Sequence, residues 1–383
     1  MSLNNDPFLN ISNSIMNSYI KEWQKNNKNV VGHYCTYVPE ELLHAANLLP
    51  FRIRSTGHKE TDLADIYMVR FTCSFVRATL DIALRGGYDF LDGLFICNSC
   101  DHTRRMFELF DLKVFKRHGF EKKVPRFYIA MPHIITDEGF EWYHKEVEEF
   151  KEELEETFTH QIITDQNLHS SIKTYNKNRD LLRKIHELRI IDTPKITGSE
   201  ALQILISNSS IPKEFANQEL ERILKFLKES EGIKSNVKRI MLVGSEVDST
   251  DFTQLIEGSE ALIVSDSLCF GTRNFLDDVH IGDGNNPLKN ISKRLYYRLS
   301  CPRMMDDYER RFDFLRNEIN RANIDGVILQ RINNCDLAGC DNMLHSHRLK
   351  DLEIPVLNLD REFYQADTTR LQTRIEAFLE MIN

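Results

Sequence analysis

The chain has 383 residues, 41% of them hydrophobic, and a formal net charge of -9. This length predicts roughly two to three domains with sizeable cores, and the negative charge gives no general basic surface, so nucleic acid is not expected as a partner. No apolar run approaches the roughly 20 residues of a membrane span, and the first residues lack the basic and apolar regions of a signal peptide, so we expect a cytoplasmic protein without membrane association. In that reducing compartment the eight cysteines are expected to serve packing, catalysis or metal binding and not disulfides.

The first part of the chain alternates strand and helix patterns. Residues 30–34 form an apolar run that leads into Cys35, and a helix is expected to open at Pro39, followed by acidic residues that suit a positive helix end. Residues 50–54 predict the next strand. Residues 73–84 carry apolar residues at helical spacing, which predicts a helix with Cys73 at its amino end, where the helix dipole favours a thiolate.

A sequence pattern occurs twice, at residues 88–101 and again at residues 323–336. In each copy Asp-Gly leads into a short apolar run, which predicts a buried strand, and polar Asn residues end the run before a Cys-Asp pair. Ligands bind open α/β sheets beyond the carboxyl ends of the strands, so two such halves facing each other would place Cys100 and Cys335 at one shared centre. The alternative is a coincidence between two buried strands.

The middle and the end of the chain differ in pattern. Residues 142–158 and 168–188 are charged amphipathic stretches without a strand pattern, which predicts helices. Strand and helix patterns then alternate again to the end of the chain, and such alternation predicts a parallel sheet. The later strands are expected at residues 238–243, 261–264, 326–329 and 354–359, and a last helix at residues 371–381. We therefore expect an α/β protein with two parallel-sheet domains and a helical region, divided as residues 1–137, 138–235 and 236–383.

Six cysteines are expected at the functional edge of these sheets. Four follow predicted strands and two begin predicted helices, and strand ends and helix starts lie at the same edge of a doubly wound sheet. Packing is the usual role of a single free cysteine, but packing does not explain why six gather there. Thiolates select zinc, copper(I) or iron–sulfur clusters, and widely separated single cysteines fit a cluster between domains better than the close pairs of a zinc site. The four after strands are Cys35, Cys100, Cys269 and Cys335, the two at helix starts are Cys73 and Cys301, and Cys97 and Cys340 are interpreted as a buried strand end and an uninvolved residue.

Several segments closely resemble the 2-hydroxyacyl-CoA dehydratase and benzoyl-CoA reductase family, and together they span nearly the whole chain. They are residues 32–42 (GHYCTYVPEEL), 73–77 (CSFVR), 90–93 (FLDG) with 98–101 (NSCD), 268–273 (LCFGTR), 301–304 (CPRM) and 371–378 (LQTRIEAF).

The resemblance implies two flavodoxin-like or Rossmann-like domains plus a helical one, and a [4Fe-4S] cluster held by three cysteines at the domain junction. Carried over by motif, the three ligands are Cys73, Cys100 and Cys335, while Cys35 and Glu41 lie in the segment that lines the active site. The family also implies a separate ATP-hydrolysing iron–sulfur activator protein that supplies single electrons, and a dimer with a second copy or a paralogous subunit. This chain has no Gly-rich loop ending in Lys-Ser/Thr, so ATP hydrolysis is expected in that partner.

The [4Fe-4S] cluster of the family takes three cysteines, so Cys269 and Cys301 are not needed for a single cubane. They point to the branch of double-cubane-cluster proteins, whose [8Fe-9S] cluster takes three cysteines for each cubane, and the alternative for this pair is buried packing. The expected function is dehydration of a 2-hydroxyacyl-CoA through a ketyl radical, with electrons received from the activator. The alternatives are a double-cubane reductase of a small molecule, and a non-catalytic electron-transfer subunit beside a catalytic homologue.

Overall fold

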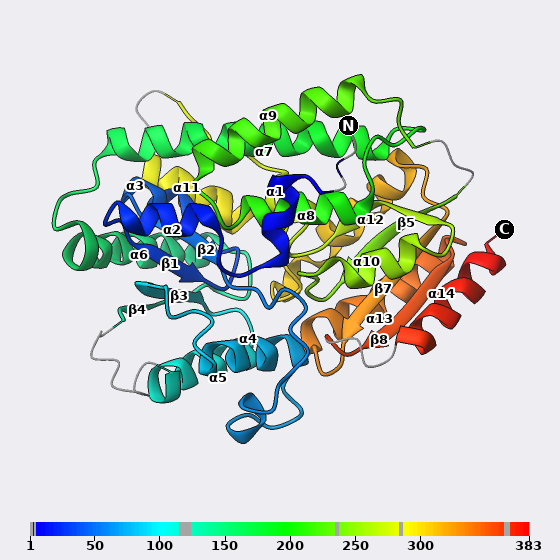
Figure 1. The fold of residues 1–383 in the computed structure, drawn as a ribbon, viewed down its shortest axis with the longest axis horizontal. Coiled ribbons are helices and arrows are strands. Elements are labelled where there is room, and N and C mark those ends of the chain that lie inside the picture. The colour runs from blue at the N-terminus through cyan, green and yellow to red at the C-terminus, as the bar shows by residue number, and fades with distance from the viewer. Residues whose placement is uncertain are drawn as a thin grey trace.

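The protein forms two parallel four-stranded sheets flanked by helices, as expected for an α/β fold with two flavodoxin-like or Rossmann-like units (Figure 1). No helix among the residues described below has the length and apolar character needed to cross a membrane. The computed structural model describes residues 3, 5–114, 124–233, 237–282, 286–363 and 368–382.

The first sheet has the strand order β2-β1-β3-β4, and every neighbouring pair is parallel. Its first three strands in the sequence are buried along their whole length, because helices cover both faces of a parallel sheet. The strands are β1 (Val30–His33), β2 (Leu49–Arg52), β3 (Gly93–Cys97) and β4 (Arg126–Ile129), and the associated helices are α3 (Glu40–Ala45), α4 (Ser74–Leu84) and α5 (Asp101–Leu109).

The second sheet has the order β6-β5-β7-β8, which is the same relative order as the first, and it is again parallel throughout. In both sheets the chain reverses its direction of progress between the first and third strands, and ligands bind at such switch points. The strands are β5 (Lys238–Gly244), β6 (Ala261–Ser267), β7 (Gly326–Ile332) and β8 (Val356–Arg361), and the helices are α10 (Thr250–Glu257), α11 (Pro287–Tyr297), α12 (Tyr308–Arg321), α13 (Asp336–Asp351) and α14 (Thr368–Met381).

Long helices lie between the two sheets in the sequence, as the amphipathic stretches predicted. In Figure 1, α7 and α9 run side by side along one long edge of the molecule, and α7 also packs against α3 of the first unit and β6 of the second. The long helix α7 therefore touches both sheet units. The boundary expected between residues 235 and 236 lies outside the described residues, and the three-part division stays a prediction. These helices are α6 (Asp137–Leu154), α7 (Asp165–Ile190), α8 (Gly198–Asn208) and α9 (Lys213–Glu229), and two short helices near the N-terminus are α1 (Pro7–Asn10) and α2 (Ser18–Lys25).

The repeated sequence pattern marks equivalent places in the two sheets. Cys100 lies three residues after the end of β3 and is the N-cap of α5. Cys335 lies three residues after the end of β7 and is the N-cap of α13. Because β3 and β7 occupy the same position in sheets of the same order, the resemblance between the two copies follows the topology of the fold.

Strand β6 is three residues longer than its apolar run predicts. Its last residues, Ser265, Asp266 and Ser267, are polar but buried. Asp266 pairs with Arg189 of α7 at 2.6 Å, and the Ser265 hydroxyl donates to Glu318 of α12 at 2.7 Å. Tertiary partners satisfy these polar groups, so hydrophobicity alone underestimates the strand.

Gly244, at the end of β5, is required by the backbone. Its φ of +129° is rarely open to other residues, and a Cβ there would lie 1.8 Å from the carbonyl oxygen of Gln330 in β7. We expect Gly244→Ala to lower the free energy of unfolding by more than about 2 kcal/mol, measured by denaturant titration of the anaerobic protein. Gly258→Ala is the control, because Gly258 has an ordinary φ of -73° and its nearest neighbour would lie at 3.1 Å. Equal losses in the two variants would contradict this account of Gly244.

Candidate functional site

Three of the six cysteines lie together where the two sheet units meet. Cys73, Cys100 and Cys335 are the N-caps of α4, α5 and α13. Burial raises the pKa of Cys73 well above its usual value, and the neighbouring Cys335 and Cys100 raise it further. At Cys73, burial and the two nearby sulfurs therefore oppose the thiolate that the helix dipole was expected to favour.

Contacts around these thiols come from both units. The Cys100 sulfur lies 3.2 Å from the Thr103 hydroxyl, and burial raises the pKa of Cys100 despite this hydrogen bond. Cys335 packs, with Ile332, against the hydrophobic core of the first unit. The backbone N–H of Phe363 donates to the Ser74 hydroxyl at 2.8 Å. The carboxyl edges of the two sheets therefore face each other at this group of thiols.

Cys269 and Cys301 form a second group with different neighbours. The Cys269 sulfur accepts a hydrogen bond of 2.9 Å from Arg52 of the first unit. Burial, and then Glu246, raise the pKa of Cys269 to about 12, against the opposing effect of Arg52. The Cys301 backbone N–H donates to the Tyr37 hydroxyl at 3.2 Å, and the Cys301 thiol is close enough to act on the pKa of both Cys269 and Cys335.

Cys301 does not begin a helix, contrary to the sequence prediction. It lies in the loop between α11 and a 3-10 helix at Met305–Asp307, and α12 begins only at Tyr308. Pro302 disfavours the helical conformation for the residue before it. A hydrogen bond of 2.9 Å from Met304 N to the Cys301 carbonyl closes a turn there instead.

Cys35 follows β1 by two residues and is 8% exposed. A hydrogen bond with the Cys97 thiol lowers the pKa of Cys35 to about 6, assisted by Arg303 and Arg298, although burial opposes the shift. Cys97 ends β3 and is fully buried, as predicted. Cys340 is exposed on α13.

A cavity lies among α3, the end of β2, α7 and α11, and Glu41 is part of its wall. The Glu41 carboxylate, 2% exposed, forms an ion pair of 2.6 Å with Arg179 of α7. Burial alone would raise the pKa of Glu41, but Arg179 and Arg294 hold it below the usual value. The wall includes Thr36 but not Cys35 itself, and its charged members are Glu40, Glu41, Arg52, Arg179, Lys213, Arg294 and Arg298.

Sequence reasoning missed the basic residues of this cavity. Arg52 stands in an otherwise apolar strand, and Arg179 stands on the buried side of a helix that was expected to be charged on its solvent side. A cation inside a strand or on an apolar helix face needs a buried partner. The positions of Arg52 and Arg179 in the sequence could therefore have indicated a buried polar site. Arg294 and Arg298 are four residues apart on and just beyond α11, and no feature of that segment separates them from surface arginines.

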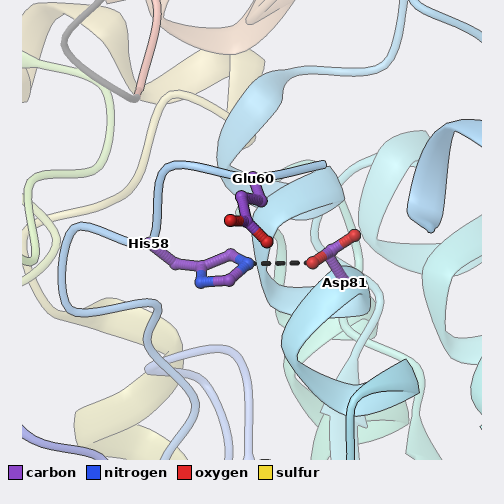
Figure 2. A group of neighbouring side chains, drawn as sticks. All are labelled: His58, Glu60 and Asp81. Carbon is purple, nitrogen blue, oxygen red and sulfur yellow. Dashed lines mark hydrogen bonds and ion pairs between the residues drawn. The ribbon is translucent and has the colours of Figure 1, made fainter. Parts of the chain in front are cut away.

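A third group of polar side chains, also missed, is structural. Figure 2 shows His58, Glu60 and Asp81 close together, with His58 Nε2 at 2.8 Å from Asp81. Arg85 already neutralises the carboxylates, because its Nε donates to Asp81 at 2.6 Å and its Nη2 lies 2.9 Å from Glu60. The backbone N–H of Leu63 also donates to Asp81. These contacts fasten the loop before Cys73 to α4.

The spacing of the thiols suits a cluster better than a single ion. One tetrahedral zinc with bonds of about 2.3 Å draws its sulfur ligands to within about 4 Å of one another. Within the described part of the chain, His58, Glu60 and Asp81 are the group of three potential ligands whose donor atoms lie within 4.8 Å of one another, and no trio of cysteines does so. A cubane is ligated at its separate corners, so its thiolates stand further apart. Within the described residues, no three thiols are therefore arranged as the sulfur ligands of a single zinc ion are.

The fold and these thiols define a class: a protein of two parallel-sheet units with cysteines at their junction. The family model for the D-component of 2-hydroxyglutaryl-CoA dehydratase matches residues 35–382, and the chain belongs to that family. This confirms the resemblance found in the sequence.

Three curated relatives are similar over most of their length. A benzoyl-CoA reductase subunit of Thauera aromatica is 26% identical, with 88% of this chain and 87% of the relative covered. The (R)-phenyllactyl-CoA dehydratase beta subunit of Clostridium sporogenes is 24% identical, over 99% and 100%. The beta subunit of (R)-2-hydroxyglutaryl-CoA dehydratase of Acidaminococcus fermentans is 24% identical, over 95% of each. The relatives are subunits of dehydratases and of a reductase, so the chain belongs to a family of enzyme components.

The Glu41–Arg179 pair predicts a stability that depends on pH. Arg179→Met leaves a buried carboxylate unpaired and is expected to cost about 3–5 kcal/mol at pH 7. Because the folded-state pKa of Glu41 lies below its usual value of 4.5, the contribution is fully present above pH 4.5 and is lost as the pH falls through the lowered pKa. Denaturant unfolding of both proteins from pH 7 to pH 3 should show the difference shrinking toward low pH.

The matched control is Arg316→Met, which removes an exposed pair with Asp313 and should cost less than about 1 kcal/mol. A loss at Arg179 that stays constant over the whole pH range would contradict the ion-pair account.

Proposed function

We propose that this chain is the iron–sulfur component of a 2-hydroxyacyl-CoA dehydratase or benzoyl-CoA reductase type of system. It takes low-potential electrons from an ATP-hydrolysing activator and passes them to a substrate. The observation that carries the proposal is the meeting of Cys73, Cys100 and Cys335 at the N-caps of three helices where the two sheets face each other. The family membership supports the class of system.

In this proposal Cys73, Cys100 and Cys335 hold a [4Fe-4S] cluster. The three residues come from different elements, so the cluster site exists only when both units are folded and docked. Without iron, burial raises the pKa of each of these thiols, and repulsion between them adds to the rise at Cys73 and Cys100. A bound metal stabilises the thiolate form. The bound cluster supplies one-electron transfer and an iron that acts as a Lewis acid.

A second candidate is the double-cubane branch, an [8Fe-9S] cluster that reduces a small molecule. The observation that favours it is the second group of thiols, Cys269 and Cys301 with Cys35 nearby. Cys269 and Cys35 both lie close enough to Arg52 to raise its pKa. Cys301 in turn raises the pKa of both Cys269 and Cys335. This arrangement supports three ligands on each side, with Cys301 next to the first group.

The chain's own residues prepare the substrate side. Glu41 is buried in the cavity wall and ionised at neutral pH, so it accepts hydrogen bonds from a substrate and does not supply a proton. Arg179, held by Glu41, presents a fixed cation to the same cavity. Cys35 acts in this proposal through its thiolate, which Cys97 and the nearby arginines favour.

The partners follow from the proposed electron route. The loop directly before Cys73 exposes Ile66, Val69 and Phe71, with 79% of Phe71 exposed. The side chain of Asn334, beside Cys335, reaches the Arg70 carbonyl of this loop at 3.5 Å. We place the activator on this apolar loop, because it is continuous with the first group of thiols. The relatives are named as subunits, which supports a second copy or a paralogue as a further partner and an acyl-CoA or a small molecule as substrate.

The ligand assignment is tested by iron content after anaerobic purification and reconstitution. Cys73→Ser, Cys100→Ser and Cys335→Ser should each lose the cluster absorption, whereas Cys97→Ser and Cys340→Ser are controls that should keep it. A single cubane gives about four irons per chain and the double cubane about eight. If Cys269→Ser and Cys301→Ser leave the iron content unchanged at about four, the double-cubane candidate is wrong, and a wild-type chain that takes up no iron contradicts the whole proposal.

The electron route is tested with a chemical low-potential donor, with and without the activator and ATP. Cluster potentials extend to about −700 mV, so full reduction is expected only with the activator and ATP present. Phe71→Ser should slow activator-dependent reduction about tenfold and leave iron content unchanged. Ile162→Ser, which alters a side chain of similar exposure, 76%, in the loop before α7, should have no effect. Full turnover with the chemical donor alone would replace this proposal by a self-sufficient reductase.

A further inference from the structure

We propose that the cavity between α7, α11 and the first sheet is a binding site for a small anion with at least two acceptor atoms, such as a short carboxylate. Arg298 and Arg294 hold it, beside Arg52. The binding claim stands on the chain's own residues, and the role of the anion as a substrate or effector of the redox site rests on the proposed function.

The charges of the cavity wall do not balance. It carries five basic side chains and two acidic ones. Glu41 pairs with Arg179 at 2.6 Å, and Glu40 lies 3.6 Å from Lys213. Arg52 pairs with Glu246, outside the wall, at 2.9 Å. Within the described residues Arg294 and Arg298 form no ion pair with a carboxylate, although Glu41 and Asp277 act on the charge of Arg294, so the wall has a surplus of positive charge. An anion supplies the missing charge.

Arg298 has an unused hydrogen-bond donor inside the molecule. The residue is 5% exposed, its Nη2 donates to the Thr36 hydroxyl, and its guanidinium lies 4.5 Å from the centre of the Tyr37 ring. Its Nε has no acceptor in the described part of the protein, and the same is true of the Arg52 Nε. A buried donor left without a partner destabilises the folded protein. A carboxylate or oxyanion in the cavity offers the acceptors that these groups lack.

Arg294 lies one helical turn before Arg298 and lines the same cavity. Its guanidinium donates to the backbone carbonyls of Asn274 at 2.6 Å and Asp277 at 3.0 Å. Burial lowers the pKa of Arg294 to about 9, and the nearby cation Arg179 contributes to the shift. A bound anion reduces this repulsion, and guanidinium groups recognise carboxylates through paired hydrogen bonds.

The size of the cavity restricts the anion to a few heavy atoms. It measures about 70 Å³, compared with about 10–15 Å³ for one water molecule and about 150 Å³ for a cavity that binds benzene. An aromatic acyl group or the pantetheine arm of coenzyme A is therefore too large for it. The size therefore fits the small-molecule candidate, whereas in the dehydratase candidate an acyl-CoA places at most a short acyl end in this cavity.

The cavity reaches the second group of thiols through one side chain. Arg52 lines the cavity and also donates to the Cys269 sulfur at 2.9 Å. Its guanidinium is held over the Phe270 ring at 3.6 Å. An anion at Arg298 and Arg52 is thus one side chain away from Cys269, so its binding changes the hydrogen bond to that sulfur.

The binding test uses the full chain without iron, purified anaerobically, with acetate as the probe. Isothermal titration and thermal unfolding at constant ionic strength compare sodium acetate with acetamide, its neutral isostere, and with benzoate. We expect acetate to bind and raise the unfolding temperature, whereas acetamide and benzoate do neither. Binding of acetamide as tight as that of acetate would overturn the charge argument, and binding of benzoate would overturn the size argument.

Arginine variants locate the site. Arg298→Gln and Arg294→Gln should each weaken acetate binding at least tenfold, and Arg316→Gln, an exposed arginine paired with Asp313, should bind as the wild type does. Arg294 is only half-buried, so Arg294→Gln keeps the test decisive if Arg298→Gln fails to fold by circular dichroism. Equal binding by wild type, Arg294→Gln and Arg316→Gln overturns the proposal.

Iron-loaded protein separates this inference from the proposed function. If the cluster assembles, acetate should change its electron paramagnetic resonance spectrum in the wild type but not in Arg294→Gln. A chain that assembles the cluster but binds no acetate overturns the anion site and leaves the proposed function standing. A chain that binds acetate through Arg294 but takes up no iron supports the anion site and overturns the proposed function.

Discussion

The relative position of the two units depends on the contacts that the Arg52 guanidinium makes across their junction. Arg52 ends β2 in the first sheet, yet its partners are Glu246 after β5, the carbonyl and sulfur of Cys269 after β6, and the ring of Phe270. Arg52 and Glu246 are both largely removed from water. The loss of either one therefore leaves an uncompensated buried charge, which typically costs about 3–5 kcal/mol. The two sheets are consequently fixed relative to each other at the same point where the cavity meets a thiol.

A second connection, built on Tyr37, joins the loop after β1 to the loop after α11. The ring lies 4.5 Å from the Arg298 guanidinium and 5.6 Å from that of Arg303, and its hydroxyl accepts from the Cys301 backbone. Burial raises the pKa of Tyr37 to about 12, so the hydroxyl stays protonated at neutral pH. Arg303 also donates to the Met131 carbonyl beyond β4. Residues far apart in the sequence thus form one rigid wall beside Cys35 and Cys301.

The sequence predicts those parts of the arrangement that depend on local sequence patterns. Apolar runs between turn residues locate the strands, and the repeated Asp-Gly and Cys-Asp pattern identifies Cys100 and Cys335 as equivalent positions, because each lies between one strand and the next helix. The cavity is different, since Arg179 and Arg298 gain their roles from partners more than a hundred residues away. The end of β6 was misjudged for the same reason, because distant partners satisfy its polar residues. The loop at Cys301 was misjudged for a local reason, because Pro302 disfavours a helix that begins at the residue before it.

The two groups of thiols lie in different electrostatic surroundings, and this difference gives the proposed electron route a direction. Hydrogen bonds with the neutral hydroxyls of Thr103 and Ser245 lower the pKa of Cys100 and of Cys335, against the larger effect of burial. Cys269 instead lies beside the cations Arg52 and Arg273 as well as the anion Glu246, and Arg303 and Arg298 lie near Cys35. Positive surroundings stabilise added negative charge, and the charge around a cluster is one of the factors that set its potential. In the proposed route, an electron that enters near the exposed loop before Cys73 moves toward these arginines, and two of them, Arg52 and Arg298, also line the cavity.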